Sequence, residues 1–257
     1  MTIGTVRAGI VYLVGAGPGA ADLLTLRAAR LLGEADIVFH DALVSPEILA
    51  LAAQAVKVPV GKRCGRHSTA QRFINKRLAD AARRYRTVVR LKGGDPMLFG
   101  RADEEIRFLE KEKIKVEIVP GITAACGASA ELGVSLTRRG VSRSVAFATP
   151  RLGEGEAPSR WARAAAAADT AVLYMAAGDA EAVRKSLLEE GLPPDTPVAV
   201  VENASLESKR VIAGTLQELP QLTARCTGGP ALLLIGEVLR ELAHENRDVP
   251  HFSTRAA

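Results

Sequence analysis

Short aliphatic runs alternate with helical patterns along the first half of the chain, and this alternation limits the possible folds. The runs are rich in β-branched residues and bounded by Gly, Pro or Asp, which is typical of strands. They cover residues 10–14, 37–40, 56–60, 87–91 and 116–119. Between them, apolar residues recur at helical spacing over residues 22–32, 69–83 and 103–113. Such alternation favours a largely parallel sheet with helices on its faces.

The same alternation resumes after Thr137. Strands are expected over residues 144–148, 171–174, 198–201 and 231–235, and helices over residues 159–167, 180–190 and 216–224. A chain of 257 residues is long enough for two modest domains. We therefore predict an α/β protein of two domains with mainly parallel sheets. The expected parts are an N-terminal domain over residues 1–136, a C-terminal domain over 137–243 and a loose tail over 244–257.

Composition narrows the choice of partners and location. The net charge of +5 suits an acidic partner, but aromatic residues make up only 4% and the arginines are spread along the chain. A nucleic-acid surface is therefore disfavoured. No apolar stretch reaches the length of a membrane span without a charge, and three cysteines without a CxxC pair indicate neither a disulfide framework nor a metal site. We expect a cytoplasmic protein that acts on a small molecule, without a membrane or nucleic-acid partner.

Three loops with unusual glycine content follow predicted strands. They are Gly15–Ala20, Gly93–Pro96 and Pro120–Ala124. In a parallel sheet, ligands bind outside the carboxyl ends of the strands, and glycine allows the backbone to approach them closely. Asp95 adds a carboxylate suited to a ribose diol or an amine. A ligand with a nucleoside end and an amino-acid end, such as S-adenosylmethionine, would need such groups.

The first loop also matches the dinucleotide-binding pattern G-x-G-x-x-G/A, with Asp41 further along the chain. A nicotinamide enzyme is therefore one alternative. Pro18 argues against it, because proline has no N–H to offer a pyrophosphate. A tight turn without any ligand is the other alternative for this loop.

Four longer segments resemble the tetrapyrrole methylases, nearest to the branch of uroporphyrinogen-III C-methyltransferases. They read VGAGPG, VGKRCGRHS, VVRLKGGDPMLFGR and VPGITAACGASAELGVSLTRR, starting at Val14, Val60, Val88 and Val119. The resemblance implies a two-domain α/β homodimer with S-adenosylmethionine in the cleft between the domains. It also implies two methylations of uroporphyrinogen III, giving precorrin-1 and then precorrin-2 for sirohaem or cobalamin, with S-adenosylhomocysteine as the other product.

Carried onto matching positions, the resemblance implies a set of site residues. The implied cofactor contacts are Pro18, Gly93, Gly94, Asp95, Leu98, Thr123, Ala124, Met175 and Ala204. The implied acid–base pair is Asp41 and Lys62. Because the substrate carries many carboxylates, arginines able to bind them in pairs of hydrogen bonds are expected to contact it. The candidates are Arg63, Arg66, Arg101, Arg138 and Arg139.

Several alternatives stay open at this point. Asp41 could cap the helix that follows its strand, and Lys62 could be a solvated cation. Departures from the family pattern, at Ala42, Ala102, Arg138, Gly140 and Pro150, lie on the substrate side, whereas the cofactor loops are intact. They leave open a later precorrin methyltransferase, or a paralogue that binds S-adenosylmethionine without turnover.

Overall fold

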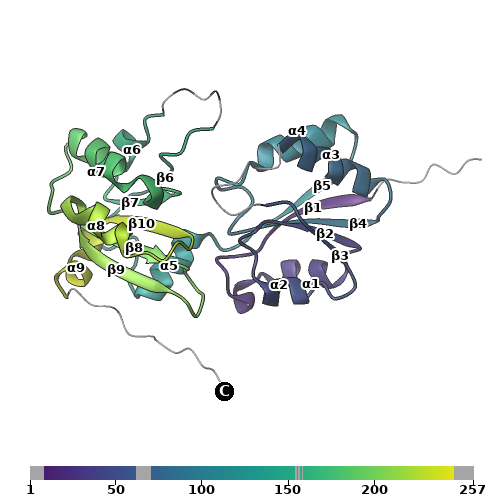
Figure 1. Cartoon of the computed structure of the whole chain (residues 1–257), viewed down its shortest axis with the longest axis horizontal. Helices are drawn as coiled ribbons and strands as arrows, with labels where there is room; N and C mark the ends of the chain where they lie inside the picture. Colours follow the sequence, from purple (N-terminus) through teal and green to yellow (C-terminus); the bar gives the residue numbers. More distant parts are fainter. Residues whose placement is uncertain (1–8, 62–70, 154, 156, 158, 246–257) are drawn as a thin grey trace, which may run out of the picture. The chain divides into compact units, whose positions relative to one another are not determined.

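Five parallel strands form the sheet of the first compact unit, Met1–Ala124, in a computed structural model that describes residues 9–61, 71–153, 155, 157 and 159–245 (Figure 1). The sheet order is β3-β2-β4-β1-β5. The strands are β1 Ile10–Gly15, β2 Ile37–His40, β3 Val56–Pro59, β4 Thr87–Lys92 and β5 Val116–Val119. Every neighbouring pair is parallel. The parallel sheet predicted for this half of the chain is confirmed.

Helices cover both faces of this sheet. They are α1 Leu26–Gly33, α2 Pro46–Ala50, α3 Gln71–Ala82 and α4 Ala102–Lys111, with a 3-10 turn η1 over Ala21–Leu23. Figure 1 shows α3 and α4 on one face and α1 and α2 on the other. Leu78 and Leu109 anchor the first pair of helices to the sheet, while Leu32 and Ile48 anchor the second. With both faces covered, the central strands are buried on two sides.

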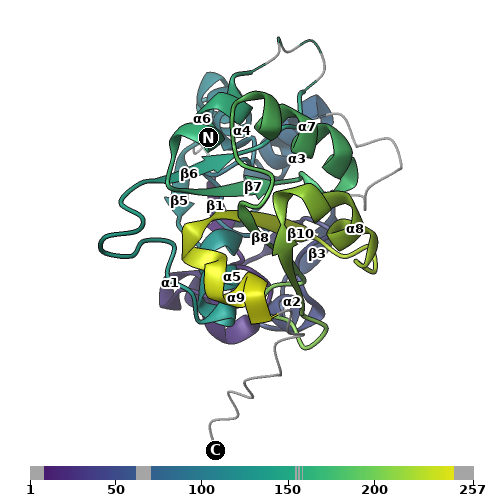
Figure 2. The same cartoon turned by 90° about the vertical axis from the view of Figure 1, so that its left-hand side faces the viewer.

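The second compact unit, Ala125–Ala257, holds a mixed sheet of order β6-β7-β10-β8-β9 (Figure 1). Figure 2 shows the chain turned by 90° from that view. The strands of this unit are β6 Val145–Ala148, β7 Thr170–Tyr174, β8 Pro197–Glu202, β9 Arg210–Thr215 and β10 Ala231–Gly236. Its helices are α5 Ala124–Leu132, α6 Trp161–Ala167, α7 Ala180–Glu189, α8 Leu219–Ala224 and α9 Arg240–Glu245, with 3-10 turns η2 Ala177–Asp179, η3 Leu216–Glu218 and η4 Glu237–Leu239. The α/β class is therefore confirmed for both units.

The strand directions of the second sheet differ from the expectation. Only β6 and β7 are parallel; the other three pairs are antiparallel. The difference arises at β9, a strand that we did not predict because its aliphatic run is short and ends in Gly214 and Thr215. β8 and β9 are joined by a short connection without a helix, and such a connection can only produce an antiparallel pair.

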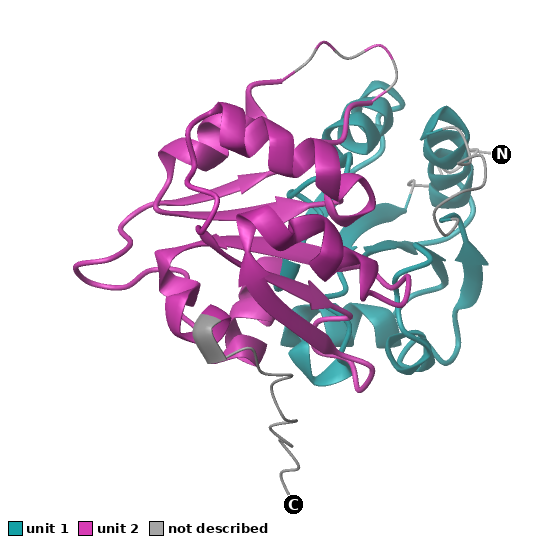
Figure 3. Ribbon diagram, turned by 60° about the vertical axis from the view of Figure 1, so that its left-hand side comes forward, with its two compact units in different colours: residues 1–124 teal, residues 125–257 magenta. Residues whose placement is uncertain are grey.

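The two compact units divide within the first turn of α5, after Ala124 (Figure 3). Helix α5 was not predicted, because its run of Ala, Gly and Ser lacks a clear apolar stripe. The sequence instead placed the joint between domains after residue 136. That boundary stays a prediction, since compactness alone does not define parts that fold independently.

Candidate active site

The three glycine-containing loops lie side by side at one edge of the first sheet. They follow β1, β4 and β5, which are parallel neighbours, so their carboxyl ends share that edge. Two backbone hydrogen bonds join the first loop to the second. The Gly94 N–H donates to the Gly17 oxygen at 2.7 Å, and the Gly17 N–H donates to the Gly94 oxygen at 3.2 Å.

Glycine is required where these loops touch. A Cβ atom added at Gly15 would lie 2.5 Å from the Cα of Gly121, and one added at Gly121 would lie 2.3 Å from the Gly94 oxygen. Backbone atoms cannot rotate away, so a larger residue must push the loops apart. At Gly94, which has a φ of 67°, an added Cβ would come near only the Ala124 nitrogen, at 3.9 Å. The second loop therefore borders space that the described residues leave open.

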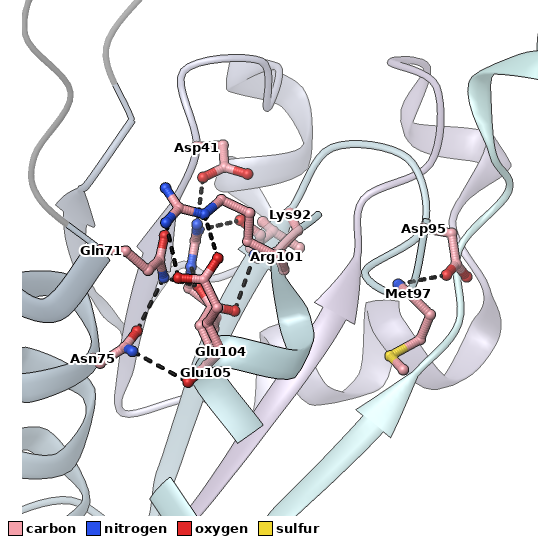
Figure 4. A network of polar contacts seen from close by, with 11 residues as sticks. Asp41, Gln71, Asn75, Lys92, Asp95, Met97, Arg101, Glu104 and Glu105 are labelled. Atoms are coloured by element: carbon pink, nitrogen blue, oxygen red, sulfur yellow. Dashed lines mark hydrogen bonds and ion pairs between the residues drawn. The ribbon is translucent and has the colours of Figure 1, made fainter. Parts of the chain in front are cut away.

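Asp95 braces two of these loops. One carboxylate oxygen accepts a hydrogen bond from the Met97 N–H at 2.8 Å (Figure 4). The other accepts from the Gly121 N–H at 2.9 Å. The sequence indicated a carboxylate for a ligand, and that role stays a prediction. The structure gives Asp95 a second role, because it holds the loop after β4 against the loop after β5.

The predicted cofactor residues of the first unit lie on these loops, except Leu98, which lies two residues beyond the second loop. Each is partly accessible at its loop: Pro18 after β1; Gly93, Gly94, Asp95 and Leu98 after β4; Thr123 and Ala124 after β5. Short loops on adjacent parallel strands bring them together although more than a hundred residues separate the first from the last. Their contact with a cofactor stays a prediction.

Left-handed backbone conformations mark the two strand ends of the second unit where further cofactor contacts were predicted. Met175 follows β7 with a φ of 56°, and it is 48% exposed. Ala204 follows β8 between Asn203 and Ser205, whose φ angles are 54° and 66°. This conformation costs a non-glycine residue on the order of 1 kcal/mol or more, and it gathers at functional sites. The strain supports a ligand-binding role for these turns.

A hydrogen bond connects the neighbours of two predicted cofactor residues. The Ala125 N–H donates to the Tyr174 hydroxyl at 3.2 Å, which ties the start of α5 to the end of β7. Ala125 follows Ala124, and Tyr174 precedes Met175. Both partners of this hydrogen bond, Ala125 and Tyr174, belong to the second unit.

Glu202, two residues before Ala204, holds the loop that precedes β10. It is fully buried at the end of β8, and its carboxylate accepts hydrogen bonds from the N–H groups of Thr227 at 2.8 Å and Gly229 at 2.7 Å. Burial alone would raise the pKa of Glu202, but these hydrogen bonds outweigh it and hold the pKa below its usual value.

A Glu202→Gln variant is therefore expected to be less stable than the wild type by about 1.5–3 kcal/mol near neutral pH. Because the pKa is lower in the folded state, the carboxylate stabilises the fold above the unfolded pKa, and this contribution is lost as the pH falls through the folded pKa. Urea unfolding at about pH 7 and about pH 4 should show the gap between the two proteins narrowing in acid. If the difference in free energy of unfolding between the two proteins were equal at both pH values, the lowered pKa of Glu202 would be contradicted.

Two cations lie buried next to each other on β4. Val89 and Leu91 pack with α1 and α2. Because side chains alternate along a strand, Arg90 and Lys92 point to the other face, toward α3 and α4. Each is only 3% exposed. Buried charges need partners, and Glu105, which is fully buried in the first turn of α4, supplies one.

Glu105 accepts three side-chain hydrogen bonds. One oxygen accepts from Arg90 Nε at 3.0 Å and from Gln71 Nε2 at 3.1 Å; the other accepts from Lys92 Nζ at 2.9 Å (Figure 4). Gln71 also donates to Asn75 Oδ1 at 2.9 Å. We call Arg90, Lys92, Glu105 and Asp41 the charge network.

Asp41 is the outermost member of the charge network. It follows β2, its side chain is 28% exposed, and Oδ1 accepts from Arg90 Nη2 at 2.5 Å. Asp41 lines a pocket of about 250 Å³ together with Arg90, Lys92, Arg101, Phe99 and Gln71, among others. The predicted catalytic carboxylate therefore faces a pocket and is held from behind by a buried arginine.

The alternative that Asp41 caps the following helix is wrong. Ser45 is the N-cap of α2, because its hydroxyl accepts from the Ile48 N–H at 3.4 Å. The Asp41 carboxylate instead accepts a hydrogen bond from Arg90. A Cβ atom added at Gly61 would lie 2.6 Å from the Ala42 nitrogen, so the chain just before Lys62 packs against the residue after Asp41. Lys62 itself lies outside the described residues, as do Arg63 and Arg66.

The charge network shifts the pKa values of its cations in opposite directions. Burial alone would lower the pKa of Arg90, but Asp41 and Glu105 outweigh it and raise the pKa above its usual value. For Lys92, burial and the neighbouring Arg90 lower the pKa, and the attraction of Glu105 does not restore it. Arg90 is therefore a permanent cation, whereas Lys92 is more easily deprotonated than an ordinary lysine.

The described substrate candidates are exposed arginines. Arg101, with a φ of 56° before α4, forms a bidentate pair with Glu104 at 2.6 and 2.8 Å. Arg138 pairs with Glu241 at 3.1 Å, and Arg139 is exposed. Arg101 lines the pocket beside Asp41. Their contact with a substrate stays a prediction.

Sequence reasoning missed Lys92 and Glu105. A signal was present in the strand V-V-R-L-K, where two basic residues alternate inside a run that belongs to a central strand. A parallel strand covered on both faces cannot leave such residues in solvent. They had to be buried with an acidic partner, and the acidic first turn of the next helix was the nearest source.

These features are typical of an α/β protein that binds a small molecule at the carboxyl ends of parallel strands. The family model of the Tetrapyrrole (Corrin/Porphyrin) Methylases matches residues 10–220, so the chain belongs to this family. The resemblance and the α/β class inferred from the sequence are thereby confirmed. None of the helices in the described ranges is long and apolar enough to cross a membrane.

Three relatives illustrate the similarity. A siroheme synthase of Tolumonas auensis is 46% identical over 232 residues, which are 90% of this chain and 49% of that protein. A uroporphyrin-III C-methyl transferase from Thermus thermophilus, solved with S-adenyl homocysteine, is 41% identical with a TM-score of 0.80, covering 91% of this chain and 100% of that one. A cobalt precorrin-4 methyltransferase is 28% identical with a TM-score of 0.78, covering 90% and 95%. The chain spans about half the length of the curated siroheme synthases that it matches.

Proposed function

We propose that this chain is an S-adenosylmethionine-dependent C-methyltransferase that methylates uroporphyrinogen III at two neighbouring rings, giving precorrin-1 and then precorrin-2. The observation that carries the proposal is the placement of Asp41 on a charged pocket in the same unit as the three joined glycine loops. Family membership and the Thermus thermophilus relative support the reaction type and the cofactor.

The loops fit S-adenosylmethionine in their chemistry. The glycines leave backbone groups accessible, and the open space beside Gly94 is one that a Cβ atom would partly fill. The residues proposed to hold the cofactor are Pro18, Gly93, Gly94, Asp95, Leu98, Thr123, Ala124, Met175 and Ala204. When bound, S-adenosylmethionine supplies a methyl group on a positively charged sulfur.

The chain's own residues position the substrate and move a proton. A ring that gains a methyl group becomes cationic and must then lose a proton, and the Asp41 carboxylate at the pocket is proposed to accept it. Arg101, Arg138 and Arg139 are proposed to bind substrate carboxylates, with Arg63 and Arg66 from the segment outside the described residues. Lys62 is proposed to assist Asp41. Holding the reactants in place is expected to supply several kcal/mol of the barrier, on the order of 7–11 in well-oriented cases.

The biological setting is also a proposal. Siroheme synthase relatives favour sirohaem synthesis, and cobalamin synthesis uses the same precorrin-2. A homodimer and a cytoplasmic location remain predictions from the resemblance and the composition.

The test is an anaerobic incubation of the purified protein with uroporphyrinogen III and S-adenosylmethionine, with the methyl count read by mass spectrometry. Two added methyl groups per substrate are the expected result. The similarity to a cobalt precorrin-4 methyltransferase makes a later precorrin the second candidate substrate. Methylation of a later precorrin instead of uroporphyrinogen III would select that candidate. Binding of S-adenosylmethionine in calorimetry without methyl transfer to either substrate would select a catalytically silent paralogue.

A further inference from the structure

Glu105 lies behind the pocket and does not line it. The pocket residues that belong to the charge network are Asp41, Arg90 and Lys92, while Glu105 is fully buried beneath them. A substrate in the pocket would therefore meet Asp41 and would not contact Glu105 directly. Any influence of Glu105 on the reaction must pass through the groups that donate hydrogen bonds to it, which are the two cations and Gln71.

Arg90 links Glu105 to Asp41 with a fully fixed guanidinium. Its Nε donates to Glu105 at 3.0 Å, its Nη2 donates to Asp41 at 2.5 Å, and its Nη1 donates to the Leu91 oxygen at 3.1 Å. A planar fork held at all three nitrogens has one orientation. The position of the Asp41 carboxylate is therefore coupled to the position of Glu105.

Stability alone does not account for this arrangement. Two buried cations and a buried carboxylate lose their hydration, and well-packed apolar residues are often as stable as a buried ion pair. The same face of the sheet is otherwise apolar, with Val11, Leu13 and Val88 packed against α3 and α4. The charge network leads from this core to the one carboxylate among its members that reaches the pocket.

We propose that Glu105 is a positioning residue that orients Asp41 through Arg90. The proposal rests on the proposed function of Asp41 as proton acceptor. Lys92 completes the arrangement as the second cation on Glu105, and Gln71 adds an uncharged hydrogen bond. No contact between Glu105 and a substrate is needed.

The kinetic test is a double-mutant cycle on the full chain with Glu105→Gln, Asp41→Asn and the double variant. Glu105→Gln alone is expected to lower kcat about tenfold or more, with KM and the affinity for S-adenosylhomocysteine little changed. Because Glu105 acts through Asp41, adding Glu105→Gln to Asp41→Asn is expected to lower kcat little further. The proposal would be overturned if the double variant lowered kcat by the product of the two single effects. It would also be overturned if Glu105→Gln left kcat unchanged.

Glu112→Gln is the matched control. It makes the same chemical change just after α4 and breaks the exposed ion pair with Arg83, which lies outside the charge network. Its kcat is expected to equal that of the wild type. If Glu105→Gln does not fold, Arg90→Lys replaces it in the cycle, because lysine keeps the charge but cannot hold both carboxylates as a planar fork.

A crystal structure of the Glu105→Gln or Arg90→Lys variant separates this proposal from the proposed function. Loss of the hydrogen bond between residue 90 and Asp41, or a turned Asp41 carboxylate, is expected whether or not the wild type transfers methyl groups. An Asp41 that keeps its position would overturn the positioning role and leave the proposed function standing. An inactive wild type with a displaced Asp41 in the variant would overturn the function alone.

Discussion

Replacing Gly121 with alanine is expected to weaken S-adenosylhomocysteine binding on the order of 100-fold and to lower the free energy of unfolding by about 1–3 kcal/mol. The added Cβ atom would lie 2.3 Å from the Gly94 oxygen and 2.8 Å from the Gly15 Cα. Both are backbone atoms, and Gly94 is held in turn by two hydrogen bonds to Gly17. The loops must therefore separate, which also strains the hydrogen bond between Gly121 and Asp95. Calorimetry and urea unfolding measure the two effects.

Gly33→Ala is the matched control in the same unit. Gly33 is the last residue of α1, and an added Cβ would meet nothing within 4 Å. Alanine is the better helix former, so this variant is expected to be more stable by about 0.5–1 kcal/mol and to bind the ligand normally. Ligand binding by Gly121→Ala at the wild-type affinity would show that the three loops do not form the cofactor site. If Gly121→Ala were as stable as the wild type, the backbone contacts between the loops would be able to rearrange around the added Cβ atom at little cost in free energy.

The glycine loops were predictable from the sequence because their residue types and the expected parallel sheet both indicate a ligand site at the same strand ends. Each loop directly follows an aliphatic run, and the parallel arrangement of β1, β4 and β5 brings the carboxyl ends to one edge. The contacts between Gly15, Gly94 and Gly121 were not predictable, since they depend on the sheet order rather than on spacing along the chain. The same holds for Asp95, whose brace to Gly121 joins residues far apart in sequence.

The charge network was hidden for a different reason. The sequence gives no distance between β4 and α4, and acidic residues in the first turn of a helix are usually exposed to solvent. Glu104 and Glu105 are adjacent and chemically alike, yet Glu104 pairs with exposed Arg101 while Glu105 is fully buried. Only the rotation of α4 on the sheet decides which of them meets Arg90.

An Asp41→Asn variant is expected to lower kcat by about 10²- to 10⁴-fold, the range that a positioned general base contributes. Asparagine has nearly the same shape and can still accept a hydrogen bond from Arg90, so the fold and the binding of S-adenosylhomocysteine are expected to be retained. The amide cannot accept the proton that the methylated ring must lose. The measurement is single-turnover methyl transfer, with cofactor binding measured on the same samples.

Asp80→Asn provides the comparison, because it makes the same change at a carboxylate on α3 whose side chain is 51% exposed. Among the described residues, this carboxylate forms an ion pair with Arg83. An exposed pair of this kind contributes little, about 0–1 kcal/mol, so its kcat should be unchanged. If Asp41→Asn also kept its kcat, proton acceptance would have to come from another group at the pocket. Lys92 would be the first to examine, since its pKa is lowered by burial and it lines the same pocket. A loss confined to Asp41→Asn instead ties the proton step to the one network carboxylate that reaches the pocket.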